Sequence, residues 1–76
     1  MTNYNLVVTG VYPPQRAMTA NNKDTLNRCQ TYLEKIMPQL IGNMEIREAE
    51  DTRGLTEPDS NVAKYVRRFL LGRPMI

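Results

Sequence analysis

Apolar and polar residues follow two different periods along this chain, and each period predicts one kind of element. Residues 4–12, YNLVVTGVY, are rich in β-branched and aromatic side chains, which favours a strand. Tyr4, Leu6 and Val8 fall on one face of this strand and Val7 on the other. Because both faces carry apolar groups, we expect the strand to lie inside a sheet or to be covered on both sides.

Pro13 and Pro14 end this strand, because neither residue has a backbone N–H to donate to a sheet. We therefore predict a loop over residues 13–21. Tyr12 stands where the chain leaves the strand, and it is the tyrosine that we most expect to be exposed.

The next segment has the three- and four-residue spacing of an amphipathic helix. Asn21 or Asn22 can cap its start, and Pro38 predicts a kink or an end near Met37. Its apolar positions are Leu26, Cys29, Leu33, Ile36 or Met37, and Leu40. A second helix of this kind begins at Thr56 or Asp59 and ends at Gly72. Its apolar positions are Val62, Tyr65, Val66, Phe69 and Leu70.

Residues 44–50 lie between the two helices and alternate Met44 and Ile46 with charged residues, which predicts a strand with one solvated face. The sequence DTRG at 51–54 is typical of a β-turn, which would lead to a short third strand around 55–56. We expect residues 73–76 to form a loose tail.

These elements predict one small mixed domain over residues 1–76, in the order β-α-β-α, with two amphipathic helices packed on the sheet. The class is α/β, with α+β as the alternative. A crossover helix favours parallel pairing of the two main strands. Because a two-stranded sheet is marginal by itself, we expect either short extra strands or edge pairing between two copies in a homodimer.

Composition agrees with a folded domain, since 41% of the 76 residues are hydrophobic and 24% are charged. The chain has one cysteine and no histidine, which excludes an intramolecular disulfide and a Cys/His zinc site. It has no apolar run of about 18 residues and no signal-peptide pattern, so we expect a cytoplasmic protein without a membrane segment.

The overall charge of +2 hides a strong asymmetry along the chain. Residues 45–59 hold six acids and two bases, whereas residues 60–76 hold four bases and no acid. The four bases are Lys64, Arg67, Arg68 and Arg73. Helical spacing puts the first three close together, so they either meet phosphates or form a solvated helix face.

The acidic segment, residues 45–59, begins with four closely spaced acids: Glu45, Glu48, Glu50 and Asp51. Carboxylates are the ligands that Mg²⁺ and Ca²⁺ prefer, but this spacing does not match an EF-hand, and strand alternation separates Glu45 from Glu48. We therefore predict no metal and no cofactor. The remaining interpretations are a surface for a basic partner and a solvated strand edge.

Side chains for catalysis are scarce. Without histidine the chain lacks the most common general acid and base, and Ser60 lies beside a helix start, where a capping or turn role is expected. Cys29 falls on an apolar helix stripe, and the four glycines are isolated rather than grouped in a phosphate loop. We predict that the chain is not an enzyme.

The sequence is therefore interpreted as a small interaction protein, such as an inhibitor, adaptor or accessory subunit, of a size that suits a phage or mobile-element regulator. It would bind a protein or a macromolecular complex through loop anchors Tyr12 and Arg16, the acidic segment and the basic helix. One alternative is a dimeric nucleic-acid-binding module that uses the basic helix. A third hypothesis is an enzyme subunit whose site is completed by another chain.

Overall fold

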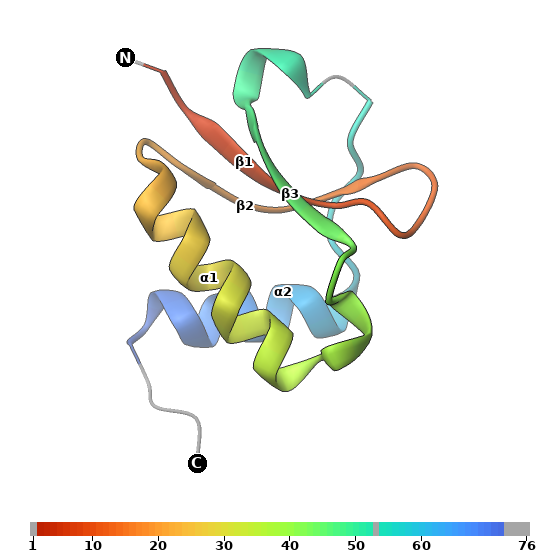
Figure 1. The fold of residues 1–76 in the computed structure, drawn as a ribbon, viewed down its shortest axis with the longest axis vertical. Helices are drawn as coiled ribbons and strands as arrows, with labels where there is room; N and C mark the ends of the chain where they lie inside the picture. The colour runs from red at the N-terminus through yellow and green to blue at the C-terminus, as the bar shows by residue number, and fades with distance from the viewer. Residues whose placement is uncertain (1, 53, 73–76) are drawn as a thin grey trace.

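A computed structural model describes residues 2–52 and 54–72 of the chain. The elements, in chain order, are β1 (Tyr4–Val8), β2 (Gln15–Ala20), α1 (Lys23–Ile36), η1 (Pro38–Leu40), β3 (Met44–Glu48), η2 (Ala49–Asp51) and α2 (Ser60–Leu70). The strands form an antiparallel sheet in the order β2-β1-β3, and both helices pack on one face of it (Figure 1). The predicted mixed domain is confirmed in its α+β form.

The prediction of a loop over residues 13–21 was wrong, because this segment contains β2. β1 ends at Val8, and the chain returns after residue 14 to pair with it. The register places Leu6 beside Met18 but Val7 beside Arg16, which leaves Ala17 as the extra residue of a β-bulge. The bulge buries the neighbours Ala17 and Met18 together, so the strand lacks the alternation that would have marked it.

The prediction of parallel pairing between the two main strands was also wrong. β1 and β3 are antiparallel, with Tyr4 beside Glu48 and Val8 beside Met44. The physical reason is the hairpin of β1 and β2, which reverses the chain before α1 begins. The helix therefore connects β2 to β3, which run in the same direction with β1 between them.

The helix ends follow the predicted signals. Asn22 caps α1 by accepting a hydrogen bond from the backbone N–H of Thr25 at 2.8 Å, and the helix stops before Pro38. Asp59 caps α2 by accepting from the N–H groups of Asn61 and Val62. One apolar position differs from the prediction, because Leu70 is 62% exposed and lies outside the core.

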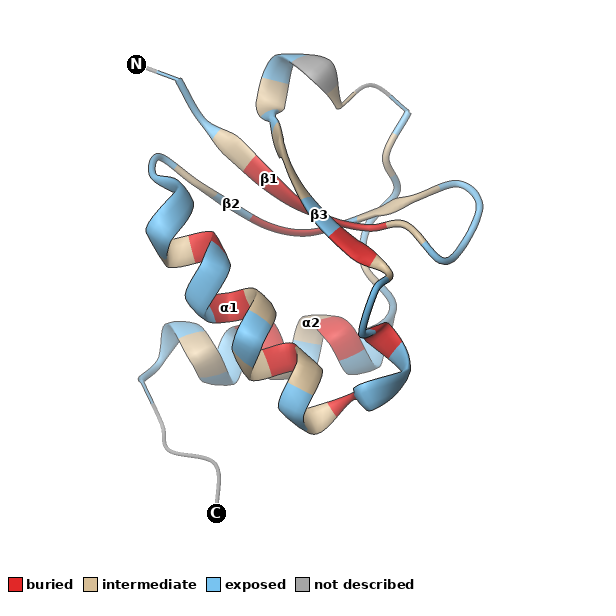
Figure 2. Ribbon diagram, in the orientation of Figure 1, coloured by how far each residue is buried: buried red, intermediate tan, exposed pale blue. Residues whose placement is uncertain are grey.

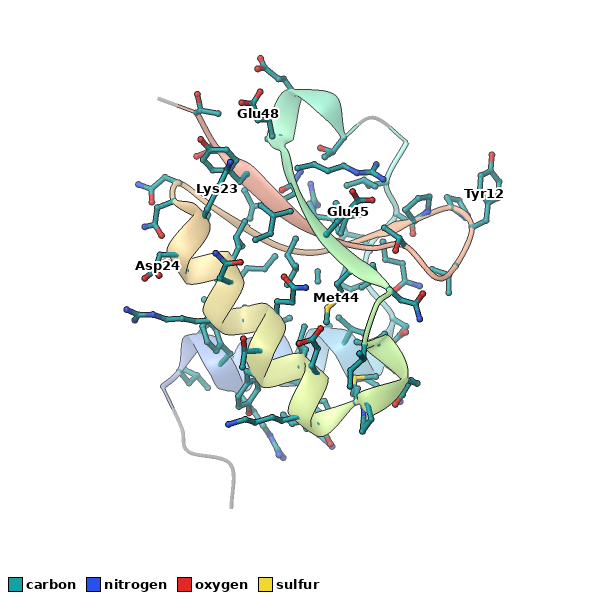
Figure 3. The ribbon with its side chains drawn as sticks, viewed as in Figure 1. Tyr12, Lys23, Asp24, Met44, Glu45 and Glu48 are labelled. Carbon is teal, nitrogen blue, oxygen red and sulfur yellow. The ribbon has the colours of Figure 1, made fainter. Side chains whose placement is uncertain are left out.

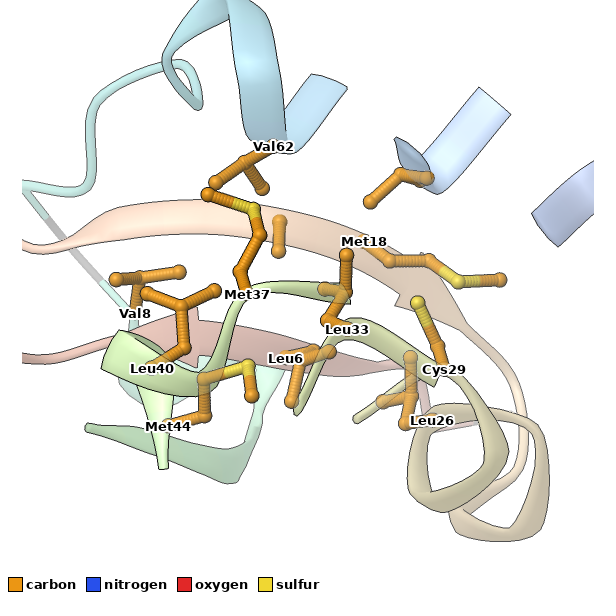
Figure 4. Packing of buried hydrophobic residues seen from close by; sticks show 12 residues of the cluster. Leu6, Val8, Met18, Leu26, Cys29, Leu33, Met37, Leu40, Met44 and Val62 are labelled. Carbon is orange, nitrogen blue, oxygen red and sulfur yellow. The ribbon is translucent and has the colours of Figure 1, made fainter. Parts of the chain in front are cut away.

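The core lies between the sheet and the helices (Figure 2, Figure 4). It contains Leu6 and Val8 from β1, with Leu26 and Leu33 from α1. The other buried members are Ala17, Met18, Cys29, Met37, Leu40, Met44, Val62 and Val66. As predicted from the alternation of residues 44–50, Met44 and Ile46 of β3 face this core.

The opposite face of the sheet is covered as well, which confirms the expectation for β1. Asn5 and Val7 are buried there. Asn5 Oδ1 accepts a hydrogen bond from the Thr19 hydroxyl, and Asn5 Nδ2 donates to Thr52 Oγ1 at 2.7 Å. Thr52 belongs to the segment that leaves β3 and reaches the outer edge of β2, so this segment crosses the face and is fixed to it.

That segment ends in a single parallel bridge between Gln15 and Thr56, at the place where a short third strand was predicted. The predicted turn at 51–54 includes Arg53, which lies outside the described residues, as does the predicted tail at 73–76.

Candidate functional site

The loop between β1 and β2 presents the most exposed aromatic side chain of the described residues. Tyr12 is 96% exposed, which confirms the expectation for this tyrosine, and its neighbour Val11 is 45% exposed. Figure 3 shows the Tyr12 side chain at the tip of the loop, directed away from the rest of the molecule. The loop therefore displays apolar and aromatic surface that nothing in the described chain covers.

The base of this loop is held by contacts with two other segments. The backbone N–H of Thr9 donates to the carbonyl of Asn43 at 2.8 Å, and the N–H of Thr56 donates to the carbonyl of Pro14 at 3.0 Å. Gly10 packs so closely on Asn43 that an added Cβ would lie 2.9 Å from Asn43 Cγ. Both ends of the loop are therefore fixed, while its tip projects into solvent.

Arg16, the second predicted loop anchor, has a different setting. It belongs to β2, its backbone N–H donates to the carbonyl of Thr56 at 3.0 Å, and its guanidinium forms an ion pair with Glu57 at 2.9 Å. These contacts hold the segment after η2 against the outer edge of β2. An exposed ion pair of this kind contributes little to stability, so the backbone hydrogen bonds of Thr56 with Pro14 and Arg16 mainly position that segment.

The predicted basic residues do gather on α2. Lys64, Arg67 and Arg68 are all exposed, and Arg73 lies outside the described residues. Lys64 Nζ is 5.5 Å and Arg68 Cζ 5.4 Å from the ring centroid of Tyr65, so two cations share one aromatic ring. Within the described chain, none of the three basic side chains forms an ion pair with a carboxylate. Their charge is therefore available to an anionic partner.

The predicted acidic residues do not converge on one point. Glu45 lies on the face away from the helices and forms an ion pair with Arg47 at 2.6 Å. This hydrogen bond raises the pKa of the Arg47 guanidinium above its ordinary value. Glu48 and Glu50 are exposed. The backbone of Asp51 belongs to η2, and its side chain is not among the groups that the structure describes. Among the described residues, no group of three acidic or cysteine side chains is arranged to hold a metal ion.

The three predicted surfaces are thus separate. Figure 1 places η2 at one end of the molecule and α2 toward the other, and Figure 3 places Tyr12 to one side of both. The structure brings the basic residues together, but it unites neither the loop with α2 nor the acidic segment with the loop.

Cys29 is fully buried in the core, as its place on the apolar stripe indicated. Burial raises the pKa of its thiol to about 12, so the thiol stays protonated at neutral pH. Sequence reasoning missed the role of Asn5, which fixes the segment after β3. The available signal was a polar residue inside the apolar run YNLVV, where a buried amide needs hydrogen-bond partners.

Comparison of the chain with known protein families, curated proteins and solved structures finds no match. In the described part of the chain, every helix is too short or too polar to cross a bilayer. The function is therefore inferred from the exposed surfaces of the molecule.

Proposed function

We propose that this chain is a small non-enzymatic protein-binding domain, acting as an inhibitor, adaptor or accessory subunit, whose main contact is the β1–β2 loop. The observation that carries the proposal is Tyr12, which is 96% exposed at the tip of a loop with a fixed base. Tyrosine is enriched among the residues that dominate the affinity of protein interfaces.

Two physical effects favour binding through Tyr12. Burying a tyrosine removes about 150 Å² or more of side-chain surface from water, and the gross gain is roughly 4 kcal/mol before the costs of association. A loop with fixed ends also loses less conformational entropy on binding than a mobile loop does. A preorganised aromatic anchor beside an apolar neighbour, Val11, suits a pocket on a partner protein.

Affinity capture from native host cells tests this proposal, with the wild type compared with Tyr12→Ala and a matched control, Ile41→Ala. Ile41 is 62% exposed and lies on the connection before β3, so its removal also deletes exposed apolar surface. We expect at least one protein retained by the wild type and by Ile41→Ala to fall about tenfold or more with Tyr12→Ala. An unchanged set of captured proteins would contradict the proposal.

A second candidate function, binding of nucleic acid, is supported by the three exposed cations of α2. If Lys64, Arg67 and Arg68 each neutralise one phosphate, replacing all three with glutamine lowers the slope of log affinity against log salt by about 2.7 on duplex DNA. The test is a titration with generic DNA and RNA at about 50 mM salt, where phosphate contacts are strong. Undetectable binding of the wild type under these conditions eliminates this candidate.

A further inference from the structure

The outer edge of β3 has a defined hydrogen-bonding pattern. The N–H of Thr9 donates to the carbonyl of Asn43, and the N–H of Ala49 donates to the carbonyl of Asn3. Because backbone groups alternate along an antiparallel strand, the odd-numbered residues of β3 face β1 and the even-numbered ones face outward. Met44, Ile46 and Glu48 therefore direct their N–H and C=O groups to the open edge. Within residues 2–52 and 54–72, no strand pairs with this edge.

We propose that this edge pairs with β3 of a second copy of the chain, antiparallel and about a twofold axis at Ile46. The strand MEIRE is complementary to itself in this arrangement. Ile46 meets Ile46 of the second copy, and Met44 meets Glu48 of the second copy, so the outward backbone groups of these residues form the new hydrogen bonds. Two three-stranded sheets then become one sheet of six strands.

Charge selects this register. Glu45 of each copy lies directly opposite Arg47 of the other, on the face away from the helices, where opposite charges in neighbouring strands attract. A shift of the axis by one residue in one direction would oppose the two Glu45 side chains, and a shift in the other would oppose the two Arg47 side chains. Registers between these do not align the outward backbone groups. Of these arrangements, only the axis at Ile46 both aligns the outward backbone groups for hydrogen bonding and places opposite charges side by side.

The side chains are already placed for this contact. Glu45 and Arg47 form an ion pair within one chain at 2.6 Å, with 49% and 36% of their side chains exposed. In the dimer, four charges of alternating sign would lie side by side. On the other face, Ile46 is half-buried at the margin of the core, and pairing would bring the two Ile46 side chains together. Pairing would therefore cover the part of Ile46 that the core leaves exposed, at an edge that charged neighbours otherwise protect.

Charge exchange combined with sedimentation velocity tests the proposal. We expect the wild type to dimerise with rising concentration, and Glu45→Arg and Arg47→Glu each to raise the dimer dissociation constant on the order of tenfold or more. Each single variant opposes like charges in all three of these registers, with the axis at residue 45, 46 or 47. The double variant Glu45→Arg/Arg47→Glu restores opposite charges and should restore the dimer. A mixture of the two single variants should form a heterodimer more readily than either variant associates with itself.

Amide exchange gives an independent measure of the same edge. The N–H groups of Ile46 and Glu48 should gain protection as the concentration rises, whereas those of the β1-facing residues Glu45 and Arg47 should stay protected at all concentrations. Circular dichroism of each variant checks that the fold is kept. A monomer mass at every concentration, or single variants that dimerise as well as the wild type, would overturn the proposal. The result is independent of Tyr12 and of the proposed partner.

Discussion

Replacing Asn5 with alanine should destabilise the domain strongly, although the Asn5 side chain is small. The side chain is 4% exposed and holds two hydrogen bonds, one from Thr19 and one to Thr52. Each bond contributes about 1 kcal/mol net, and the half-buried Thr52 hydroxyl loses its partner as well, so the total is roughly 2 to 3 kcal/mol. A domain of 76 residues has only about 4 to 11 kcal/mol of stability, so this is a large share.

Urea unfolding followed by circular dichroism measures this change. Asn27→Ala is the matched control, because Asn27 lies on the exposed face of α1, and we expect it to change the free energy of unfolding by less than about 0.7 kcal/mol. Thr52→Val removes one of the two partners, and a double-mutant cycle with Asn5→Ala should give a coupling energy of about 1 kcal/mol. By thermal unfolding, Asn5→Ala should lower Tm by roughly 10 to 20 °C.

We infer from the hydrogen bond between Asn5 and Thr52 that Asn5 fixes the segment after β3 to the sheet. A loss for Asn5→Ala no greater than that for Asn27→Ala would refute it, as would a coupling energy with Thr52 close to zero. In either case the segment would be held by other contacts, such as the backbone hydrogen bonds of Thr56 with Pro14 and Arg16.

Three further changes have expected outcomes. The thiol of Cys29 should resist alkylation at pH 8 until urea unfolds the chain. Because burial raises the pKa of this thiol, its contribution to the free energy of unfolding is present below pH 9 and is lost as the pH rises toward about 12. Urea titrations across this pH range would detect the loss. Fast alkylation of the native protein would contradict this. Asp59→Ala should cost about 1 kcal/mol through loss of the α2 cap, whereas Asp59→Asn should cost much less because asparagine caps equally well; equal losses would argue against capping. Leu33→Ala should cost about 2 to 5 kcal/mol because Leu33 is fully buried, and a loss below about 1 kcal/mol would mean that the core is packed differently.

The helices were predictable from the sequence because their signals are local. Apolar residues recur at helical spacing, and Asn22, Asp59 and Pro38 mark where the helices start or stop. β3 was predictable from its alternation. β2 was not, because the bulge at Ala17 breaks the period of two and Pro14 precedes the strand. Without β2, the order of the elements pointed to parallel pairing.

The candidate site was predictable to a similar degree. The exposure of Tyr12 followed from its place beside two prolines, and the grouping of the basic residues followed from helical spacing. The ion pair of Arg16 was not predictable, because Glu57 reaches it only after the chain has crossed the sheet. Asn5 was missed for the same reason, since its partner Thr52 is distant in sequence.

Photo-crosslinking tests most directly whether the tip of the β1–β2 loop contacts a partner protein. A photoreactive phenylalanine analogue would replace Tyr12 in one variant and Ile41 in another, and both variants would be irradiated in native host cells. The proposal predicts one discrete crosslinked protein with the analogue at position 12, absent with the analogue at position 41 and reduced by an excess of untagged wild type. No crosslinked product at position 12, or the same products at both positions, would contradict it.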